Sequence, residues 1–413
     1  MMAPPAIAVT GMGCISAAGA TLAAYEQTVT GTPPSCAPVP KWLFDTAFSF
    51  PVFMAPPDPL GPRARQILAA NVLGLTEETV HRTVLLALEA AVQALAQAGL
   101  QPEDIRDKRV GFSLGTTVGC GFNAESYYAA WRQGKRPDLA PVLAYYHANI
   151  STTVQALLGL QGPVAVVTNA CASGTDAIGL AKGWLETDRC DLVLAGGADG
   201  MSRITCNGFA SLLLADAQPC RPYDVSRKGL NLGEGAGILC LEKEQDARRR
   251  NAPLCGYVRG YGAGSDAYHP TAPHPQGVGM VIALNKALAT AAKTIQDISF
   301  INGHGTGTAA NDLAETTALA TVFGRQQVPL ISTKPLTGHT LGAAGGLEAV
   351  FTLAALRQGR VKGSVRCLDI DPALPYKPLP EHAEAELAGA VGISQSLAFG
   401  GGNGCLILEA VHA

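Results

Sequence analysis

One cysteine and two histidines stand at positions where a protein could use them for acyl transfer. Cys171 follows the β-branched run 164–168 and precedes a segment with small and apolar residues at helical spacing. His304 follows the apolar run 298–301, and His339 lies directly before a glycine- and alanine-rich segment. Because ligands collect at the carboxyl ends of strands in open α/β sheets, we expect the three side chains to converge there. A thiol beside two imidazoles is suited to accepting and passing on an acyl group.

The setting of Cys171 predicts a reactive thiol. At the start of a helix, the positive end of the helix dipole and the free backbone N–H groups favour a thiolate, so we expect a lowered pKa. A buried structural cysteine explains that motif alone equally well, and a lone histidine is more often a satisfied polar residue than a catalyst. The convergence of all three residues favours the nucleophilic interpretation. None of the eleven cysteines forms a CxxC pair, so we expect no zinc ribbon, no thioredoxin-like site and no bound metal.

The elements that must position these residues alternate along the chain. Short β-branched runs alternate with Ala/Leu-rich segments of helical spacing, which is typical of an α/β protein with buried strands. The predicted strands are 6–10, 110–114, 164–168, 191–197, 328–332 and 405–410. A helix is predicted over 79–98, with Gly99 as the residue that ends it.

Two segments share one layout, which predicts a structural repeat. In each, a strand (164–168 or 328–332) leads through a polar turn into a helix rich in small residues. We therefore expect two related halves, over 1–250 and 251–413, joined without a flexible linker. The first half would carry the nucleophilic cysteine and the second half the two histidines.

The composition excludes several classes of function. Hydrophobic residues make up 47% of the 413 residues and charged residues only 15%, so much of the chain should be buried in its own core or in a subunit interface. A net charge of −3 argues against a nucleic-acid partner. The longest charge-free stretch, 139–175, is interrupted by glycines and prolines, so we expect no membrane span. The first residues lack the basic segment of a secretory signal, and we expect a cytoplasmic protein.

Two other motifs suggest ligands and are better explained otherwise. The glycine-rich segment 9–16 has Ser16 where a dinucleotide-binding fingerprint requires glycine. His269 and His274 suggest a metal site, but prolines surround them and no third ligand follows the pattern. No GxSxG motif occurs, so a serine hydrolase is not supported.

Four ordered motifs carry a resemblance to a known family. They are Asn-Ala-Cys-Ala-Ser-Gly (169–174), Gly-His-Gly-Thr-Gly-Thr (303–308), Lys-Pro-Leu-Thr-Gly-His (334–339) and Phe-Gly-Gly-Gly-Asn-Gly (399–404). Together they resemble the Cys-His-His β-ketoacyl synthases, the elongating condensing enzymes of fatty-acid and polyketide assembly, over nearly the whole chain. The resemblance implies a thiolase-like α/β fold, a duplicated αβαβα arrangement of layers.

The resemblance also implies a mechanism. Cys171 would take the acyl chain from an acyl carrier protein as a thioester, which splits the condensation into two easier steps. His304 and His339 would donate hydrogen bonds to the thioester oxygen of malonyl carrier protein while decarboxylation makes an enolate. The oxyanion of the acyl thioester would lie between the backbone N–H groups of Cys171 and Phe399. No cofactor of the enzyme's own is implied, because the phosphopantetheine arm belongs to the carrier protein.

Supporting roles follow from the same resemblance. Phe399 and Gly400 would form a gate to the acyl pocket, and Lys334 would form a charge pair with Glu315 beside His304. Contacts to the phosphopantetheine arm are implied for Thr306, Thr308, His269 and Thr271. The simpler alternative for the charged pair is a surface lysine and a glutamate near a helix start.

Three other functions stay open as alternatives. One is a ketosynthase subunit of a specialised type II polyketide or polyene pathway, working as a heterodimer with a related subunit instead of as a homodimer. Another is a non-catalytic subunit like a chain-length factor, against which the presence of Cys171 argues. A thiolase usually uses a second cysteine as its base, and here both downstream positions are histidines.

The docking surface for the carrier is where the sequence departs from the family. Segment 210–220 lacks the arginine that is common there, and two glutamates at 77–78 occupy a region that is often basic. Arg63, Arg65 or Arg82 could supply a basic rim from other positions. Otherwise the enzyme uses a dedicated, less acidic carrier or a partner subunit that completes the docking surface.

Overall fold

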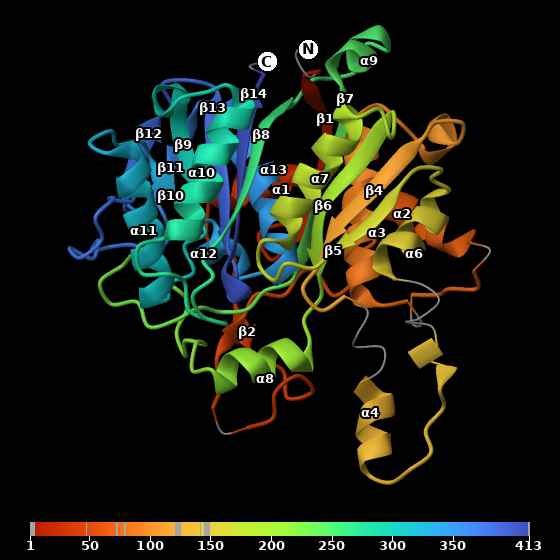
Figure 1. The fold of residues 1–413 in the computed structure, drawn as a ribbon. Coiled ribbons are helices and arrows are strands. Elements are labelled where there is room, and N and C mark those ends of the chain that lie inside the picture. Colours follow the sequence, from red (N-terminus) through yellow and green to blue (C-terminus); the bar gives the residue numbers. More distant parts are fainter. Residues whose placement is uncertain are drawn as a thin grey trace.

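The computed structural model describes residues 5–46, 48–71, 73–77, 80–119, 125–140, 142–143 and 149–411. Within them, ten strands form one mixed sheet in the order β10-β9-β13-β14-β8-β1-β7-β6-β4-β5 (Figure 1). One half of it consists of β1 (Ile7–Ser16), β4 (Val110–Gly115), β5 (Val164–Val167), β6 (Leu192–Asp199) and β7 (Gly235–Lys243). The other half consists of β8 (Gly256–Ser265), β9 (Ile298–Asn302), β10 (Leu330–Ile331), β13 (Val391–Leu397) and β14 (Gly402–Ala410). The halves join where β1 pairs with β8.

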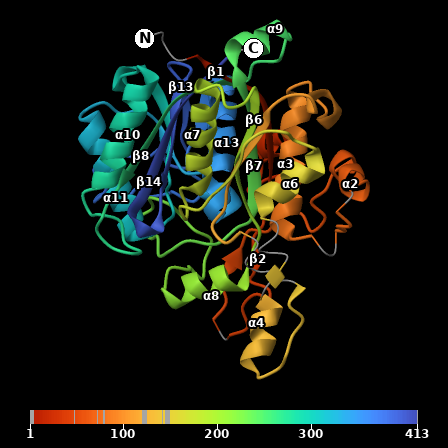
Figure 2. The ribbon, with the colours of Figure 1, turned by 45° about the vertical axis from the view of Figure 1, so that its right-hand side comes forward.

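The helices form one inner layer, which lies between the two halves of the sheet, and two outer layers, one on the far face of each half. The inner helices α7 (Ser173–Glu186) and α13 (Ala344–Gln358) each pack against strands of both halves. On the outer faces, α3 (Arg82–Gln97) covers β1, β6 and β7, and α10 (Val278–Ala291) covers β8 and β14 (Figures 1 and 2). The result is the αβαβα order of layers of the thiolase-like fold, as the resemblance implied.

The remaining elements surround these layers. The helices are α1 (Leu22–Thr30), α2 (Pro62–Ala69), α4 (Glu125–Arg132), α6 (Ile150–Leu158), α8 (Arg203–Ser211), α9 (Glu244–Arg249), α11 (Ala309–Phe323) and α12 (Lys334–Thr337). Short 3-10 turns are η1 (Pro102–Ile105), η3 (Ile295–Asp297), η4 (Leu341–Ala343) and η5 (Phe399–Gly401). Two small two-stranded sheets pair β2 (Ala37–Pro38) with β3 (Pro51–Val52) and β11 (Arg360–Lys362) with β12 (Glu384–Glu386). No helix in the described part of the chain combines the length and the apolar character needed to cross a bilayer.

The six predicted strands are confirmed, and so is the long N-terminal helix. The helix is α3, whose first helical residue is Arg82 because the His81 ring accepts a hydrogen bond from the Thr83 N–H and caps the start. Gly99 follows its end with φ +69°, the left-handed conformation that glycine adopts without strain. Thr79, the predicted first residue, lies outside the described residues.

The repeated strand, turn and helix units are present as β5 with α7 and β10 with α13. Glycines allow the starts of the two inner helices to approach closely: a Cβ at Gly174 would lie 2.7 Å from the Gly346 nitrogen and 2.8 Å from the Gly342 oxygen. This contact places the start of α7 beside the loop that leads into α13. The division of the chain at residue 250 stays a prediction.

Candidate active site

Cys171 sits in a tight elbow between β5 and α7. The residue before it, Ala170, has φ +43°, a left-handed conformation that is costly for a residue with a Cβ. Ser173 closes the elbow, because its Oγ donates to the Ala170 oxygen at 2.6 Å and accepts from the Asn169 N–H at 2.8 Å. The elbow therefore holds the thiol at the end of α7 that faces the α13 loop.

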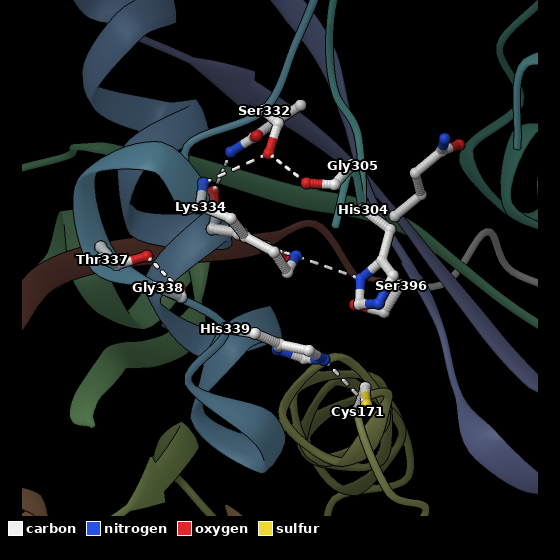
Figure 3. A network of polar contacts seen from close by, with 12 residues as sticks. Cys171, His304, Gly305, Ser332, Lys334, Thr337, Gly338, His339 and Ser396 are labelled. Carbon is white, nitrogen blue, oxygen red and sulfur yellow. Dashed lines mark hydrogen bonds and ion pairs between the residues drawn. The ribbon is translucent and has the colours of Figure 1, made fainter. Parts of the chain in front are cut away.

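His339 reaches the thiol from that loop. Its Nε2 lies 3.0 Å from the Cys171 Sγ (Figure 3), while its Nδ1 accepts a hydrogen bond from the Leu341 N–H at 3.2 Å. Because Nδ1 is the acceptor, the ring proton of a neutral His339 resides on Nε2. The backbone N–H of His339 donates to the Asn231 oxygen at 2.7 Å, which fixes the loop.

His304 is oriented by a buried lysine. The Lys334 Nζ lies 3.2 Å from the His304 Nδ1 (Figure 3). It also lies 2.5 Å from the Glu348 Oε1. An ammonium group only donates, so it makes Nδ1 the acceptor and leaves the proton of the neutral ring on Nε2. The rings of His304 and His339 are nearly perpendicular, with centroids 5.1 Å apart. Both neutral histidines therefore carry the ring proton on Nε2. The Nδ1 of His304 faces the Lys334 ammonium, and the Nδ1 of His339 accepts from the Leu341 N–H.

The predicted charge pair between Lys334 and Glu315 is wrong. Lys334 pairs instead with Glu348 of α13. Glu315 is fully buried and accepts hydrogen bonds from the backbone N–H groups of His304 and Gly305, the Tyr223 hydroxyl and the Gln395 amide. Glu315 therefore holds the backbone of the His304 loop, whereas Lys334 holds the His304 ring.

Burial sets the protonation of the three central residues. Burial, and then the Lys334 charge, holds the pKa of His304 and of His339 well below the usual value, so both rings are neutral at pH 7. The expected lowering of the Cys171 pKa is wrong. Burial raises the pKa of this thiol to about 12, against the opposing effects of the Lys334 charge and the Phe399 backbone N–H. Loss of hydration changes the pKa of this thiol more than the helix terminus does, because only 4% of Cys171 is exposed.

The same three side chains are spaced closely enough to suggest a metal site, with their ligand atoms within 4.8 Å of one another. The groups behind the imidazoles argue against that interpretation. A histidine that binds a metal donates its second N–H to an acceptor, whereas Nδ1 of His304 and His339 each face a donor. The Lys334 ammonium would also repel a cation. This arrangement is suited to donating two N–H groups to an oxygen that becomes negative.

A cavity of about 290 Å³ opens over Cys171 and the two histidines. Its apolar lining comprises Phe209, Leu212, Leu214, Leu230, Leu397 and Phe399. Thr306, Thr308 and Thr271, three of the residues for which the resemblance implies contact with the arm, also line the cavity. His269 is exposed and not among the lining residues; its Nδ1 accepts the N–H groups of Thr271 and Ala272 and shapes that turn.

Phe399 lies between the thiol and helix α8. Its ring stacks on Phe209 with centroids 5.3 Å apart, and Phe209 in turn meets the His339 ring edge-on at 6.3 Å. Gly400, beside it, has φ +82° and donates its N–H to the Pro270 oxygen at 2.7 Å. The ring that was predicted to gate the pocket therefore forms part of its wall.

Two acidic residues of the site were missed from the sequence. Glu348, the partner of Lys334, is the only acidic residue of α13, and an acid within an apolar helix is a signal that could have found it. Asp199 ends β6 and accepts from the Thr116 hydroxyl at 2.6 Å and the Gly342 N–H at 2.7 Å, so it ties the His339 side of the site to the sheet. Burial raises the pKa of Asp199 to about 6.

Comparison with known proteins agrees with this geometry. The family model of the β-ketoacyl synthase N-terminal domain matches residues 5–247, and that of the C-terminal domain matches residues 255–367. The 3-oxoacyl-[acyl-carrier-protein] synthase 2 of Staphylococcus aureus (strain N315) is 33% identical over 349 residues, which cover 81% of this chain and 83% of that protein.

A relative from polyketide synthesis is equally similar. The tetracenomycin polyketide synthase ketoacyl synthase alpha subunit of Streptomyces glaucescens is 33% identical over 347 residues, 80% of this chain and 81% of that protein. Among solved structures, the ishigamide ketosynthase/chain length factor superposes with a TM-score of 0.86 at 28% identity, covering 99% of this chain and 100% of that one. With both halves matched and the Cys-His-His arrangement in place, the chain belongs to the β-ketoacyl synthase family, whose members form carbon–carbon bonds by acyl transfer.

Proposed function

We propose that this enzyme condenses malonyl-[acyl carrier protein] with an acyl chain held as a thioester on Cys171, releasing CO2 and giving a β-ketoacyl chain on the carrier. The observation that carries this proposal is the pair of neutral imidazoles that each present an Nε2–H beside the thiol. Cys171, His304 and His339 are the catalytic residues on this account. A non-catalytic binding subunit would have no use for this arrangement.

In the loading step, the Cys171 sulfur attacks the carbonyl carbon of the acyl thioester. The sulfur–carbon bond forms, the bond to the pantetheine sulfur breaks, and that thiol leaves with the cysteine proton. The oxyanion of this step would be stabilised by the backbone N–H groups of Cys171 and Phe399. The Lys334 charge and the Phe399 N–H would stabilise negative charge that develops on the sulfur as its proton leaves, which partly opposes the effect of burial on its pKa.

In the condensation step, the malonyl carbon–carbon bond breaks and its electron pair moves into the thioester, giving an enolate and CO2. The enolate oxygen would accept hydrogen bonds from the Nε2–H groups of His304 and His339, and no general base is required. The enolate carbon then attacks the acyl carbon on Cys171, and the released thiolate takes a proton from water.

The arm of the carrier protein would fill the cavity, so the enzyme needs no cofactor of its own. Thr306, Thr308 and Thr271 line that path and would contact the arm, while His269 would shape its border. Phe399 and Gly400 would act as the gate, since a half-buried ring next to glycines at φ +82° and +78° can swing on them.

We also propose that the enzyme works as a cytoplasmic dimer. Strand β5 lies at one edge of the sheet, and its four residues, Val-Ala-Val-Val, are only half-buried. An apolar edge strand invites pairing with another sheet, and a second subunit would cover it. A related partner in place of an identical one is the alternative, favoured by the similarity to a polyketide synthase alpha subunit and to a ketosynthase/chain length factor.

Intact-protein mass spectrometry after incubation with acyl carrier protein tests the assignment. Cys171→Ala should accumulate no acyl adduct, whereas Cys36→Ala, which removes a half-exposed thiol elsewhere, should load like the unmodified enzyme. His304→Ala and His339→Ala should still load but release CO2 from malonyl carrier protein about 10²–10³ times more slowly. An adduct on Cys171→Ala at the normal level, or loss of loading with normal decarboxylation in the histidine variants, would show that the roles are assigned wrongly.

A further inference from the structure

A leucine at the mouth of the catalytic cavity is held in an unfavourable conformation. Leu212 and Leu214 line the cavity, and Leu213 between them is 87% exposed with φ +57°. Leu213 occupies the position just after α8 that glycine usually takes, with the Leu214 N–H bonded back to the Phe209 oxygen at 3.1 Å. The left-handed backbone and the solvated apolar side chain both cost free energy. The Leu213 and Leu214 N–H groups satisfy the Ala210 and Phe209 oxygens at the helix end, but the side chain stays in solvent.

Leu213 belongs to a larger apolar surface, which we call the apolar rim. It is defined by Trp42, Phe44, Phe48, Ile204, Ala210 and Leu213. Trp42 is 58% exposed, Ile204 54% and Phe48 45%, and a shallow groove runs between Phe44, Phe48, Ala210 and Leu213. Figures 1 and 2 both place α8 and the segment around β2 together, beyond the ends of the sheet strands. Exposed apolar patches of this kind mark interaction surfaces.

The arginines that could have made a basic rim are all paired with carboxylates. Arg63 pairs with Glu103, Arg65 with Asp58 and Glu77, and Arg82 with Glu234. Glu78, the second glutamate of the acidic segment, lies outside the described residues. On the rim itself, Arg203 donates to the Trp42 oxygen at 2.6 Å. Among the described residues that line the cavity, the exposed Lys228 carries a positive charge.

We propose that the apolar rim is the docking surface for the carrier protein, which binds it through an apolar face. The inference rests on the proposed function, because a substrate tethered to a carrier brings the carrier surface to the cavity mouth whenever the thioester reaches Cys171. The rim adjoins that mouth through Leu212 and Leu214. Lys228 complements the negative phosphate of the arm. Trp42, Phe48, Ile204 and Leu213 would supply the hydrophobic part of the contact.

Two consequences separate this docking mode from one based on charge. Salt screens attraction between exposed charges but leaves burial of apolar surface intact, so docking should depend only weakly on ionic strength. Specificity should follow the apolar face of the carrier instead of its net charge. Leu213 would be the central contact, since it is the most exposed large apolar residue in the part of the chain that the structure describes.

The test compares acyl transfer to Cys171 from hexanoyl carrier proteins and from free hexanoyl-pantetheine, which needs no docking. Leu213→Gly removes the side chain and also relieves the backbone, so the protein should unfold at the same or a higher temperature. We expect the kcat/KM for loading from the preferred carrier to fall about 10-fold, and that from hexanoyl-pantetheine to stay unchanged. Leu368→Gly, which changes another leucine that is 62% exposed, is the matched control.

Each outcome decides one question. Docking is supported if Leu213→Gly slows only transfer from the carrier and if loading changes less than twofold between low and high salt. It is overturned if the variant loads normally from a fatty-acid and a polyketide carrier, or if loading falls steeply with salt. Binding of the wild-type rim to phospholipid vesicles, lost in Leu213→Gly without effect on transfer, would identify a lipid surface and overturn it too. Failure of the unmodified enzyme to load from free hexanoyl-pantetheine would count against the proposed function itself, and the docking mode with it.

Discussion

At the floor of the catalytic cavity, buried hydrogen bonds link Lys334 to His304 and Glu348, and the Leu341 amide holds the buried His339. At the rim, by contrast, Leu213 lies almost wholly in solvent. The floor has its charges paired and its ring tautomers set before any substrate arrives, so little reorganisation is needed when the enolate forms. The rim keeps apolar surface that the described residues of the chain leave exposed. The contrast indicates that the chemistry is built within one subunit, while recognition is completed by a partner.

The largest effect on stability is expected from substitution of Glu348, which pairs with Lys334 at the floor of the cavity. Glu348→Ala leaves the Lys334 ammonium buried without a counter-charge, which should lower the free energy of unfolding by about 3–5 kcal/mol. Glu348→Gln keeps an acceptor and should be milder. Equilibrium unfolding in urea measures both, with Glu384→Ala, which breaks the exposed pair with Arg360, as a control expected to cost below about 1 kcal/mol. A loss below about 1 kcal/mol in Glu348→Ala would mean that Lys334 does not depend on this partner.

A smaller effect is expected in the pH dependence of stability. The folded protein keeps His304 neutral, whereas the unfolded chain protonates it below about pH 6.5. Because the unfolded state then binds more protons, this residue makes stability fall as the pH falls below 6.5. His304→Asn should remove that contribution, about 1.4 kcal/mol per pH unit between pH 6 and 5.

The measurement is urea unfolding of the enzyme and of His304→Asn at a series of pH values. The exposed His382 offers the matched control variant, His382→Asn. Equal slopes for the enzyme and His304→Asn would contradict a neutral, buried His304. Asp199 and Asp312 act in the opposite direction, since burial raises the pKa of each to about 6, so the comparison between variants is more informative than the slope of the enzyme alone.

The smallest effect is expected where floor and rim meet, at Phe399. Phe399→Ala removes the ring contact with Phe209, worth about 0.5–1.5 kcal/mol. Acyl selectivity should suffer more than stability, because malonyl groups would enter before the acyl chain is loaded. Mass spectrometry of Cys171 after competition between acyl and malonyl carriers measures this, with Phe399→Leu as the variant that keeps apolar bulk. An unchanged acyl-to-malonyl ratio in Phe399→Ala would reduce Phe399 to a packing residue.

The sequence alone predicted those features that depend on local pattern. β-branched runs located the strands, and the residues after them located Cys171, His304 and His339, because chain turns at strand ends bring such side chains to one edge. The ion-pair partner of Lys334 could not be predicted from local sequence pattern. Glu315 and Glu348 are both buried acids after strand–helix turns, and only the packing of α13 against the sheet decides which one meets the lysine.

Two further properties escaped the sequence because they arise from tertiary structure. The pKa of Cys171 follows from how completely the surrounding loops exclude water, and a helix start alone predicted the wrong direction. The left-handed backbone of Leu213 has no sequence signal, since glycine or asparagine is the expected residue at such a position. Only the three-dimensional structure shows that Leu213 adopts this conformation, which local residue preferences do not predict.

The central claim is that two neutral histidines donate Nε2–H groups to the reacting oxygen. Nitrogen NMR of the enzyme with 15N-labelled histidine, assigned with His304→Asn and His339→Asn, tests it directly because the ring-nitrogen shifts distinguish both tautomers and the imidazolium. The account predicts the neutral Nε2–H tautomer for both residues at pH 7, with Nδ1 in the acceptor role that Lys334 and the Leu341 amide impose. An imidazolium, or a proton on Nδ1 of either ring, would contradict it.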